Sequence, residues 1–355
     1  MEQMNGLSIY SFRKLSLKAV VFCLLYLVFL LPVRAQETEG IYDQKGVEIN
    51  RLRLVTKFPT EKSKVEVNLV DRIAEFFFGK KEAIVLSKPI SVFAENPDSF
   101  WVLDQGLGSL LKVQDGVGEI PQSFHQHYTS LVGICALPQG DLLFTESRLN
   151  KVFKLNKDES ADKLLEFCPA VKLDQPTGIA FSSLKNEVWV VETALHRITV
   201  LDLQGKVIRH IGKRGDGPLE FNFPTFLWID KSGLVYIVDA MNFRVQILNS
   251  EGEFISMFGE IGDATGYFSR PKGIATDSFG NIYIVDALFH AVQIFDKNGN
   301  FLYYFGGQGR KDGKFWLPTG IFIDDNDFIY VADSYNSRIQ VFQLINGRLN
   351  DNDKD

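Results

Sequence analysis

The strongest constraint on the fold of this chain is a phrase that returns six times. It reads VYIVDAMNFRVQIL at Val235–Leu248, NIYIVDALFHAV at Asn281–Val292 and IYVADSYNSRIQVF at Ile329–Phe342, and weaker copies lie upstream. The carboxylates that share one position of the phrase are Asp104, Glu146, Glu192, Asp239, Asp286 and Asp333, at spacings of 42, 46, 47, 47 and 47 residues. A near-constant period of this length predicts a repeat architecture in which each copy is one supersecondary unit.

Each of the last three copies also has glycine, phenylalanine and proline at fixed positions. Glycine recurs at 212, 259 and 306, phenylalanine at 221, 268 and 315, and proline at 224, 271 and 318. These residues suit a loop that leads into a strand such as PKGIATD, and turns then separate three further apolar runs. One four-stranded sheet of this size cannot bury both faces, whereas six arranged radially cover one another. The sequence therefore predicts an all-β fold, a six-bladed β-propeller of four-stranded antiparallel blades.

The last copy lacks its fourth strand, because only the polar, acidic tail RLNDNDKD follows IQVFQLING. Ahead of the first copy, AEFFFG resembles FLYYFG of the fifth copy. We therefore predict that an N-terminal strand, Ile73–Phe78, supplies the outer strand of the last blade and closes the ring, which removes an exposed edge. The expected organisation is a signal peptide at 1–35, a lead segment at 36–64, the propeller at 65–347 and an acidic tail at 348–355.

The N-terminus predicts export. Basic residues precede the apolar run Ala19–Leu31, and Val33 and Ala35 stand ahead of an expected cut after Ala35. The run of about 13 residues is short for a membrane span. A periplasmic or extracellular protein is expected, and an uncleaved N-terminal anchor, which would hold the protein at a membrane, is the alternative.

Charge and cysteine content narrow the function further. A net charge of -6 provides no general basic footprint, so no nucleic-acid partner is expected. After cleavage only Cys135 and Cys168 remain, and buried thiols are favoured over a disulfide, although an oxidising compartment would permit one. No CxxC or Cys/His spacing indicates a zinc site.

The repeat P-x-G-I-A-x-D-x-x-G-x-I-Y-V-x-D-x-x-x-x-R-V-Q-x-F resembles the NHL repeat, a family of six-bladed propellers. The matching residues of the fifth copy are Pro271, Gly273, Ile274, Ala275, Asp277, Gly280, Ile282, Tyr283, Val285, Asp286, Val292, Gln293 and Phe295. The departure is Ala291, where other copies have Arg197, Arg244 and Arg338. The resemblance is strong in the last three copies, fair in the third and faint in the first two.

This resemblance implies a fold more firmly than a function. NHL propellers serve as protein-binding platforms, as RNA-binding domains in some animal regulators, and as the catalytic body of a metal-using peptide-amidating lyase. A shared fold does not select among these activities.

The repeated carboxylates are predicted to be structural brackets, because a catalytic residue has no reason to recur in every blade. An acid five residues before an arginine can pair with it across the turn that joins the second and third strands. The bracket residues are Glu192 with Arg197, Asp239 with Arg244, Asp333 with Arg338, and Asp286. The alternative is a ring of carboxylates that holds a cation such as calcium at one mouth of the channel.

One face of a propeller gathers the lead-in loops, which enter the innermost strands, and the turns between the second and third strands. We call it the loop face. Its aromatic and charged residues suit recognition of a protein, peptide or glycan by a monomeric platform, and ordinary solvated loops are the alternative. The candidate binding residues are His196, Asn242, Phe243, Phe289, His290, Tyr335, Asn336, Arg214, Arg270 and Trp316. The tripeptide Arg214-Gly215-Asp216 falls on a recurring glycine and is interpreted as a coincidence.

A metal-dependent lyase or hydrolase at the channel mouth is the alternative function. His196 and His290 share one turn position two blades apart, and His125 and His127 precede the second blade, so convergence on a zinc ion is conceivable. Spacing alone does not show convergence. No cofactor is firmly implied, and calcium and zinc are the candidates for the central channel.

Overall fold

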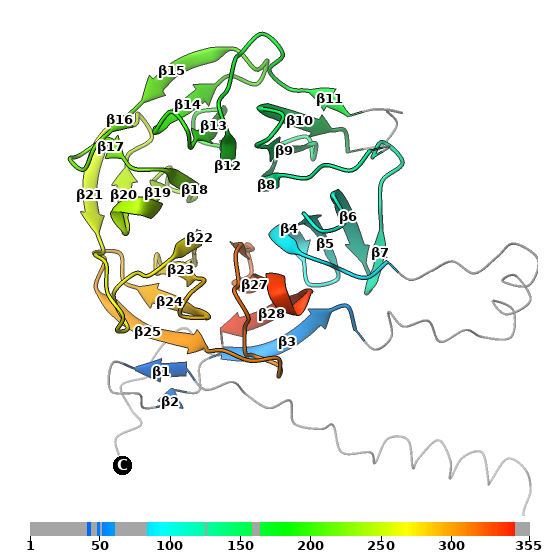
Figure 1. Cartoon of the computed structure of the whole chain (residues 1–355), viewed down its shortest axis with the longest axis vertical. Coiled ribbons are helices and arrows are strands. Elements are labelled where there is room, and N and C mark those ends of the chain that lie inside the picture. The colour runs from blue at the N-terminus through cyan, green and yellow to red at the C-terminus, as the bar shows by residue number, and fades with distance from the viewer. Residues whose placement is uncertain are drawn as a thin grey trace, which may run out of the picture. The chain divides into compact units, whose positions relative to one another are not determined.

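The computed structural model describes residues 41–43, 48–49, 52–60, 84–124, 126–157 and 164–344. The expected signal peptide, the acidic tail and Ile73–Phe78 lie outside these ranges. Within them the chain is an all-β six-bladed propeller (Figure 1), as the repeat predicted, with two short 3-10 turns, η2 (Ala240–Asn242) and η3 (Ser334–Asn336). No helix of the described residues is long and apolar enough to cross a membrane.

The first three blades follow the chain in order from the innermost strand outward. The first holds β4 (Pro89–Asn96), β5 (Ser99–Asp104), β6 (Ser109–Gln114) and β7 (Val117–Glu119). The second holds β8 (Leu131–Ala136), β9 (Leu142–Glu146), β10 (Lys151–Leu155) and β11 (Leu165–Glu166). The third holds β12 (Pro176–Ser182), β13 (Glu187–Glu192), β14 (Arg197–Leu201) and β15 (Val207–Ile211).

The last three blades continue this pattern. The fourth holds β18 (Pro224–Ile229), β19 (Val235–Asp239), β20 (Arg244–Leu248) and β21 (Phe254–Phe258), and a parallel pair, β16 (Lys213–Arg214) and β17 (Glu220–Phe221), lies in its lead-in loop. The fifth holds β22 (Pro271–Thr276), β23 (Ile282–Asp286), β24 (Ala291–Phe295) and β25 (Phe301–Gly306). The sixth holds β26 (Ile321–Ile323), β27 (Phe328–Asp333) and β28 (Arg338–Leu344).

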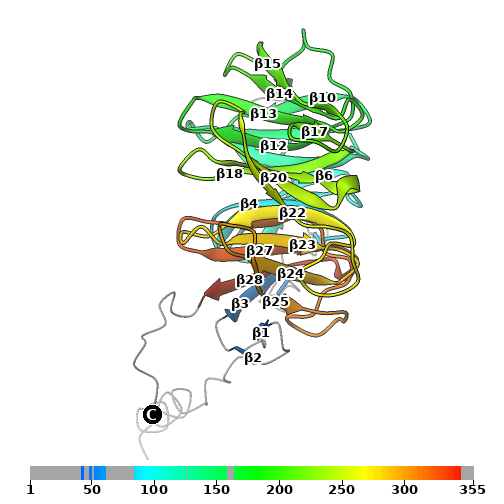
Figure 2. The same ribbon diagram turned by 90° about the vertical axis from the view of Figure 1, so that its left-hand side faces the viewer.

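An N-terminal strand closes the ring, as expected, but it is a different strand from the one the sequence indicated. β3 (Leu52–Phe58) pairs antiparallel with β28, with Ile339 opposite Phe58 and Leu344 opposite Leu52 (Figure 2). The closing strand therefore comes from within residues 36–64, the expected lead segment, and takes the place assigned to Ile73–Phe78. The reason is burial: Leu52 and Phe58 are 0% and 2% exposed, so LRLVTKF alternates correctly for this edge.

The fifth blade is extended at its outer edge by a second N-terminal piece. β1 (Ile41–Asp43) pairs with β25, and β2 (Glu48–Ile49) pairs with β1, so this sheet has six strands. The N-terminal region thus adds strands to two adjacent blades.

The described core lies between the blades rather than inside any one of them. Each junction has its own cluster of buried side chains; for example, Tyr283 and Val285 of the fifth blade pack with Val331 and Phe342 of the sixth. A blade removed from the ring would expose two such clusters, which is why the repeat is stable only when closed.

The recurring Gly and Phe residues form one packing unit in each lead-in loop. Gly306 has φ of +107°, and a Cβ there would lie 2.5 Å from the ring of Phe315, which is fully buried. The same relation joins Gly259 to Phe268, at 2.3 Å. Only glycine tolerates both the backbone angle and the ring, so the two columns recur together.

Candidate functional site

All six repeated carboxylates are buried, and each is at most 1% exposed. Each accepts a hydrogen bond from a backbone N–H group of the lead-in loop, and Asp104, Glu146 and Asp286 also accept from backbone N–H groups of the turn that follows. Asp104, for example, accepts from Lys88 N at 2.9 Å and from Gly106 N at 2.8 Å. The carboxylates therefore hold the lead-in loops and satisfy backbone donors that would otherwise be unpaired.

Three of the carboxylates carry the arginine expected from the five-residue spacing. The distance from arginine Nε to the carboxylate oxygen is 2.8 Å for Arg197–Glu192, 2.9 Å for Arg244–Asp239 and 2.8 Å for Arg338–Asp333. These contacts are those of a hairpin bracket.

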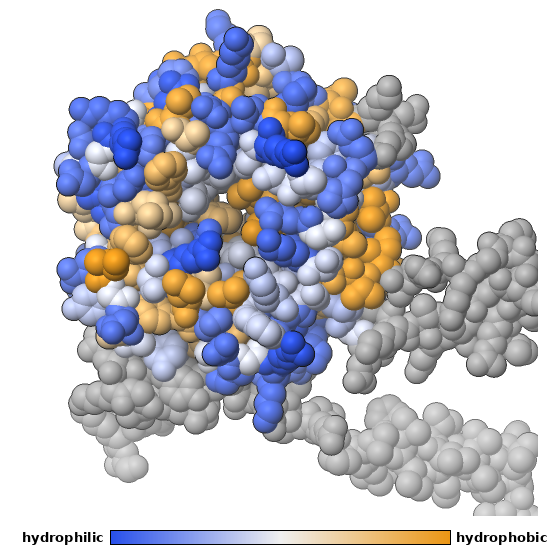
Figure 3. Space-filling model, viewed as in Figure 1, coloured by the Kyte–Doolittle hydropathy of each residue, from blue (hydrophilic) through white to orange (hydrophobic). Residues whose placement is uncertain are grey.

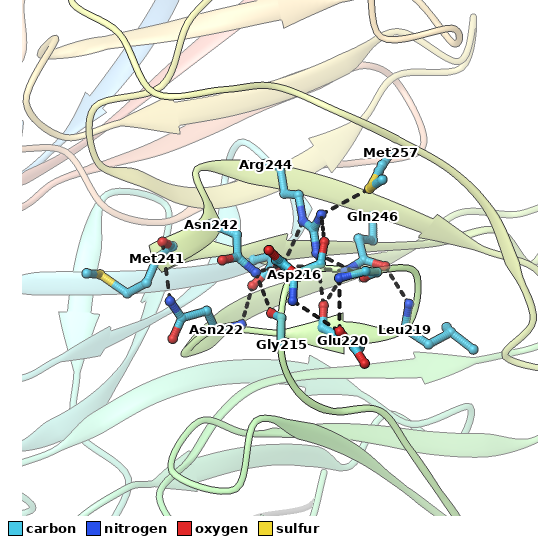
Figure 4. A network of polar contacts seen from close by, with 12 residues as sticks. Gly215, Asp216, Leu219, Glu220, Asn222, Met241, Asn242, Arg244, Gln246 and Met257 are labelled. Carbon is cyan, nitrogen blue, oxygen red and sulfur yellow. Dashed lines mark hydrogen bonds and ion pairs between the residues drawn. The ribbon is translucent and has the colours of Figure 1, made fainter.

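Arg244 shows how such a bracket also holds the lead-in loop (Figure 4). Its guanidinium donates to the carbonyl oxygens of Gly217 and Glu220 at 3.1 and 3.0 Å, and to the carbonyl of Asp216. Asp216 belongs to the Arg214-Gly215-Asp216 tripeptide, so the backbone of this tripeptide accepts a hydrogen bond from the bracket arginine. Arg338 holds the carbonyls of Lys311 and Lys314 in the same way, each at 2.7 Å.

A second set of bonds joins neighbouring blades, and we call it the latch. The residue after the carboxylate donates to the carbonyl of the first residue of the next innermost strand. Thr193 Oγ1 reaches Pro224 O at 2.7 Å, and Gln105 Nε2 reaches Leu131 O at 2.8 Å. Ser147 reaches Pro176 O and Ser334 reaches Pro89 O, both at 2.5 Å. The latch position was not predicted from the sequence, although hydroxyl side chains at 147, 193 and 334 indicate it.

The latch position is occupied by Ala240 in the fourth blade and by Ala287 in the fifth. Alanine has no side-chain donor, so no latch of this kind joins the fourth blade to the fifth, or the fifth to the sixth. The fifth blade is therefore unlatched on both sides.

The two candidate histidines do not converge on one point. Each has its own backbone partner in the next blade: His196 Nδ1 accepts from Phe223 N at 3.0 Å, and His290 Nδ1 accepts from Leu317 N at 3.0 Å. Asn150 fills the same turn position and accepts from Gln175 N at 2.8 Å. His196, His290 and Asn150 all have φ between +53° and +58°, so a side-chain acceptor recurs on a left-handed residue.

Acceptance at Nδ1 requires that this nitrogen carries a lone pair, so the imidazole must be neutral. Burial lowers the pKa of His290 below its ordinary value of 6.5, although Asp333 and Asp286 act in the opposite direction. His127 lies near Gly106 O at 3.4 Å, and His125 lies outside the described residues. Within the described part of the chain, no group of three or more His, Cys, Asp or Glu side chains is arranged to hold a metal ion.

The remaining candidate residues fall into two groups. Asn242 and Asn336 belong to the brackets, since their amides donate to Gly215 O and Gly309 O at 2.9 and 2.8 Å and also to the carboxylates. Phe243 and Phe289 are half-buried, and Phe243 packs on the core between the fourth and fifth blades. Arg214 is exposed in β16.

Tyr335 and Trp316 form an aromatic pair on the sixth blade, with ring centroids 6.5 Å apart. A cation faces each ring: Arg310 lies 5.0 Å from the Trp316 centroid, and Lys88 of the first blade lies 6.0 Å from that of Tyr335. The two rings and the two cations thus form one aromatic and cationic cluster that spans the sixth and first blades.

Large apolar side chains are exposed around the loop face, mostly from the turns between second and third strands. They are Leu149, Leu195, Phe223, Met241, Leu288 and Tyr335, between 39% and 56% exposed. Figure 3 shows one face of the ring, where apolar and hydrophilic side chains are interspersed around a central hollow. Large apolar side chains are exposed elsewhere as well, for example Leu184 and Phe279 at 58% and 55%.

Below the mouth, the central channel contains a cavity of about 200 Å³. Innermost strands line it, with Phe93, Phe181, Trp228 and Phe322 supplying aromatic walls. Cys135 also lies on this lining; Cys135 and Cys168 are both free and buried, as expected. Burial raises the pKa of the Cys168 thiol to about 12.

Comparison with known proteins agrees with this architecture. The NHL repeat model matches residues 315–342, and a family model described as a 6-bladed beta-propeller matches residues 171–258. The chain is thus an NHL-type six-bladed propeller, as the repeat pattern predicted. A search of curated proteins returns no significant match.

Solved structures show the same fold at low sequence identity. A virginiamycin B lyase from Staphylococcus aureus is similar with a TM-score of 0.54 and 15% identity over 74% of this chain and 98% of the lyase. An auxiliary nutrient binding protein from Bacteroides thetaiotaomicron is similar with a TM-score of 0.59 and 12% identity over 73% of this chain and 70% of that protein. One of these neighbours is a catalyst and the other a binding protein, so the likeness establishes the fold alone.

Proposed function

We propose that this protein is an exported, monomeric binding platform whose loop face recognises a protein, peptide or glycan. The observation that carries the proposal is the composition of that face: exposed apolar side chains surround the channel mouth, and Trp316 and Tyr335 stand beside Arg310 and Lys88. Aromatic and arginine side chains of this kind supply most of the binding energy in protein interfaces.

Rigidity supports the proposal. The brackets and latches order the loops before a ligand arrives, so little conformational entropy remains to be lost on binding. His196 and His290, the residues on which a metal-dependent lyase would have to rely, each use Nδ1 for a bond to the next blade. These bonds favour a structural role for both side chains.

The test is a binding screen of the secreted, tag-free protein on arrays of glycans and peptides. The loop-face variant Met241→Ser/Leu288→Ser/Tyr335→Ala should lose at least tenfold in affinity for whatever the wild type binds. Leu184→Ser/Phe279→Ala is the matched control, because these side chains are 58% and 55% exposed on turns of the opposite face. Equal loss in both variants, or no binding by the wild type, would count against the proposal.

A further inference from the structure

The fifth blade departs from the sixth at three positions of the repeat, and it shares only the first of these departures with the fourth blade, which has Ala240. Ala287 replaces the latch hydroxyl, Ala291 replaces the bracket arginine, and Lys272 occupies a position that is threonine in the third, fourth and sixth blades. The first two changes remove bonds that hold the blade and its lead-in loop. The third places a charge where the other blades have a small hydroxyl.

The threonines show what the third position does elsewhere. Thr319 lies 2.7 Å from the latch hydroxyl of Ser334, and Thr177 lies 2.7 Å from that of Thr193. In the fourth blade the latch residue is Ala240, and Thr225 Oγ1 is buried with no hydrogen-bond partner in the described residues. The fourth blade therefore lacks the hydroxyl pair of the third and sixth blades, and the fifth blade lacks both of its hydroxyls.

Lys272 lies on the innermost strand of the fifth blade. It stands near the start of the innermost strand β22, where the adjacent Gly273 N donates to Thr319 O of the next blade at 2.8 Å. The positive charges of Arg270 and Lys88 act on the Lys272 ammonium. Lys88 belongs to the first blade, which is not adjacent to the fifth. Lys88 and Arg270 occupy the same position of the repeat, directly before the innermost strands β4 and β22, so they and Lys272 lie where the innermost strands begin.

These cations have no counterion among the described residues. Lys272 is half-buried, and neither it nor Arg270 makes a side-chain hydrogen bond or ion pair in that part of the chain. Burial, and then the nearby Arg270 and Lys88, lower the pKa of Lys272. Like charges gathered without an anion destabilise the free protein and favour an anionic ligand.

We infer that the channel mouth at the fifth blade binds a carboxylate of the ligand that the loop face recognises. The inference rests on the proposed binding function and deepens it, since it identifies the ligand as an acidic peptide end or an acidic sugar. A carboxylate accepts hydrogen bonds at both oxygens. The Lys272 ammonium, which has three N–H donors and no partner among the described residues, supplies the donors. Arg270 and Lys88, at the rim, attract the charge.

The experiment compares defined probes on wild type and Lys272→Thr. The substituted threonine is the residue that the chain itself uses in three other blades, so the fold should accept it. The probes are glucuronate against glucose, and a tripeptide with a free C-terminus against its amide, read by calorimetry and by ¹H–¹⁵N chemical shifts. Lys231→Thr is the matched control, because Lys231 is an exposed lysine of the opposite face.

Glucuronate or the free tripeptide should bind wild type and Lys231→Thr, and Lys272→Thr should weaken this binding at least tenfold. The neutral probes should not bind. Lys272→Thr should also melt no lower than wild type, because it removes an unpaired half-buried charge. Binding of inorganic phosphate alone would overturn the carboxylate assignment.

Failure of this inference can be told from failure of the proposed function. If Tyr335→Ala abolishes capture on the array while Lys272→Thr binds acidic ligands normally, the platform stands and the carboxylate site is wrong. If neither substitution changes capture, both are wrong.

Discussion

The fifth and sixth blades share one repeat and diverge in how they are held. In the sixth, Asp333 pairs with Arg338 at 2.8 Å, Arg338 holds two carbonyls of the lead-in loop, and Ser334 latches to Pro89 of the first blade. The fifth keeps the carboxylate Asp286, which accepts from Arg270 N and Leu288 N at 3.0 and 3.1 Å, but it has neither arginine nor latch.

The two blades differ in their brackets and latches because they differ in how the chain builds them. The sixth is a composite of both ends of the chain, so its loops must be fixed if the ring is to stay closed. The four strands β22 to β25 of the fifth come from one continuous segment, and this blade carries Arg270 and Lys272, whose side chains make no hydrogen bond or ion pair among the described residues. Local rules of a repeat are expected to fail at functional sites, where a stabilising residue gives way to a binding one.

The largest effect is expected at the closing strand of the sixth blade. Phe58→Ala should lower the free energy of unfolding by about 3–5 kcal/mol, because the ring is 2% exposed and packs 6.1 Å from Phe100. Chemical denaturation measures the change. Ile255→Ala in the outer strand of the fourth blade, where the side chain is 49% exposed, is the control and should change stability by no more than about 0.5 kcal/mol. Equal effects would mean that β3 does not close the ring.

The bracket of the sixth blade comes next. Arg338→Ala should cost about 3 kcal/mol, because it removes the cationic partner of the fully buried Asp333 carboxylate and one hydrogen bond from each of two lead-in carbonyls. Arg338→Lys keeps the charge but cannot reproduce the forked geometry, so an intermediate loss is expected. Arg214→Ala, an exposed arginine outside the brackets, is the control for denaturation. A loss below about 1 kcal/mol in Arg338→Ala would contradict the structural role.

The bond from the fifth blade to the sixth through His290 can be broken without a charge change. His290→Ala should cost about 1–3 kcal/mol, since it leaves Leu317 N unpaired and places alanine at φ +54°. His290→Asn should restore most of this, because Asn150 makes the same contact in the second blade. If His290 instead supported catalysis, both substitutions would abolish turnover while His290→Asn kept its stability.

The same bond predicts a pH dependence. Burial lowers the pKa of His290 in the folded protein, so the unfolded chain takes up a proton first as the pH falls through about 6.5. Stability from this group is therefore present above that pH and is lost below it. Melting temperatures from pH 8 to pH 5 should fall more steeply in wild type than in His290→Asn. Parallel curves for the two proteins would show that protonation of the His290 imidazole does not change the stability of the fold.

The smallest effect is a gain. Ala287→Ser should supply the missing latch to the carbonyl of Pro318 and raise stability by about 0.5–1.5 kcal/mol, the usual net value of one hydrogen bond. Ala240→Ser repeats the change between the fourth and fifth blades. Thermal denaturation of both variants tests whether the absence of latches distinguishes the fifth blade. If neither variant is more stable than wild type, the comparison is weakened.

The fold and part of the loop face could be predicted from the sequence. The period, the recurring Gly, Phe and Pro, and the Asp–Arg spacing are local patterns, and each corresponds to a local contact. The closing strand was misplaced because AEFFFG and LRLVTKF both suit an outer strand, and only pairing with β28 separates them. The latch was overlooked because its acceptor lies in the next blade, far away in the sequence, and Lys272 was overlooked because its lack of a partner shows only in the folded ring.

The sequence by itself determined the number of blades, their strand order and the carboxylate of each bracket, because these depend on periodicity and on residues within one repeat. Tertiary structure decided which N-terminal strand closes the ring, which blade is unlatched, and that Lys88 of the first blade acts electrostatically on Lys272 of the fifth. The physical reason is that ring closure brings together equivalent positions of different repeats. A charge or hydroxyl gains or loses its partner there only once the neighbouring blades are in place.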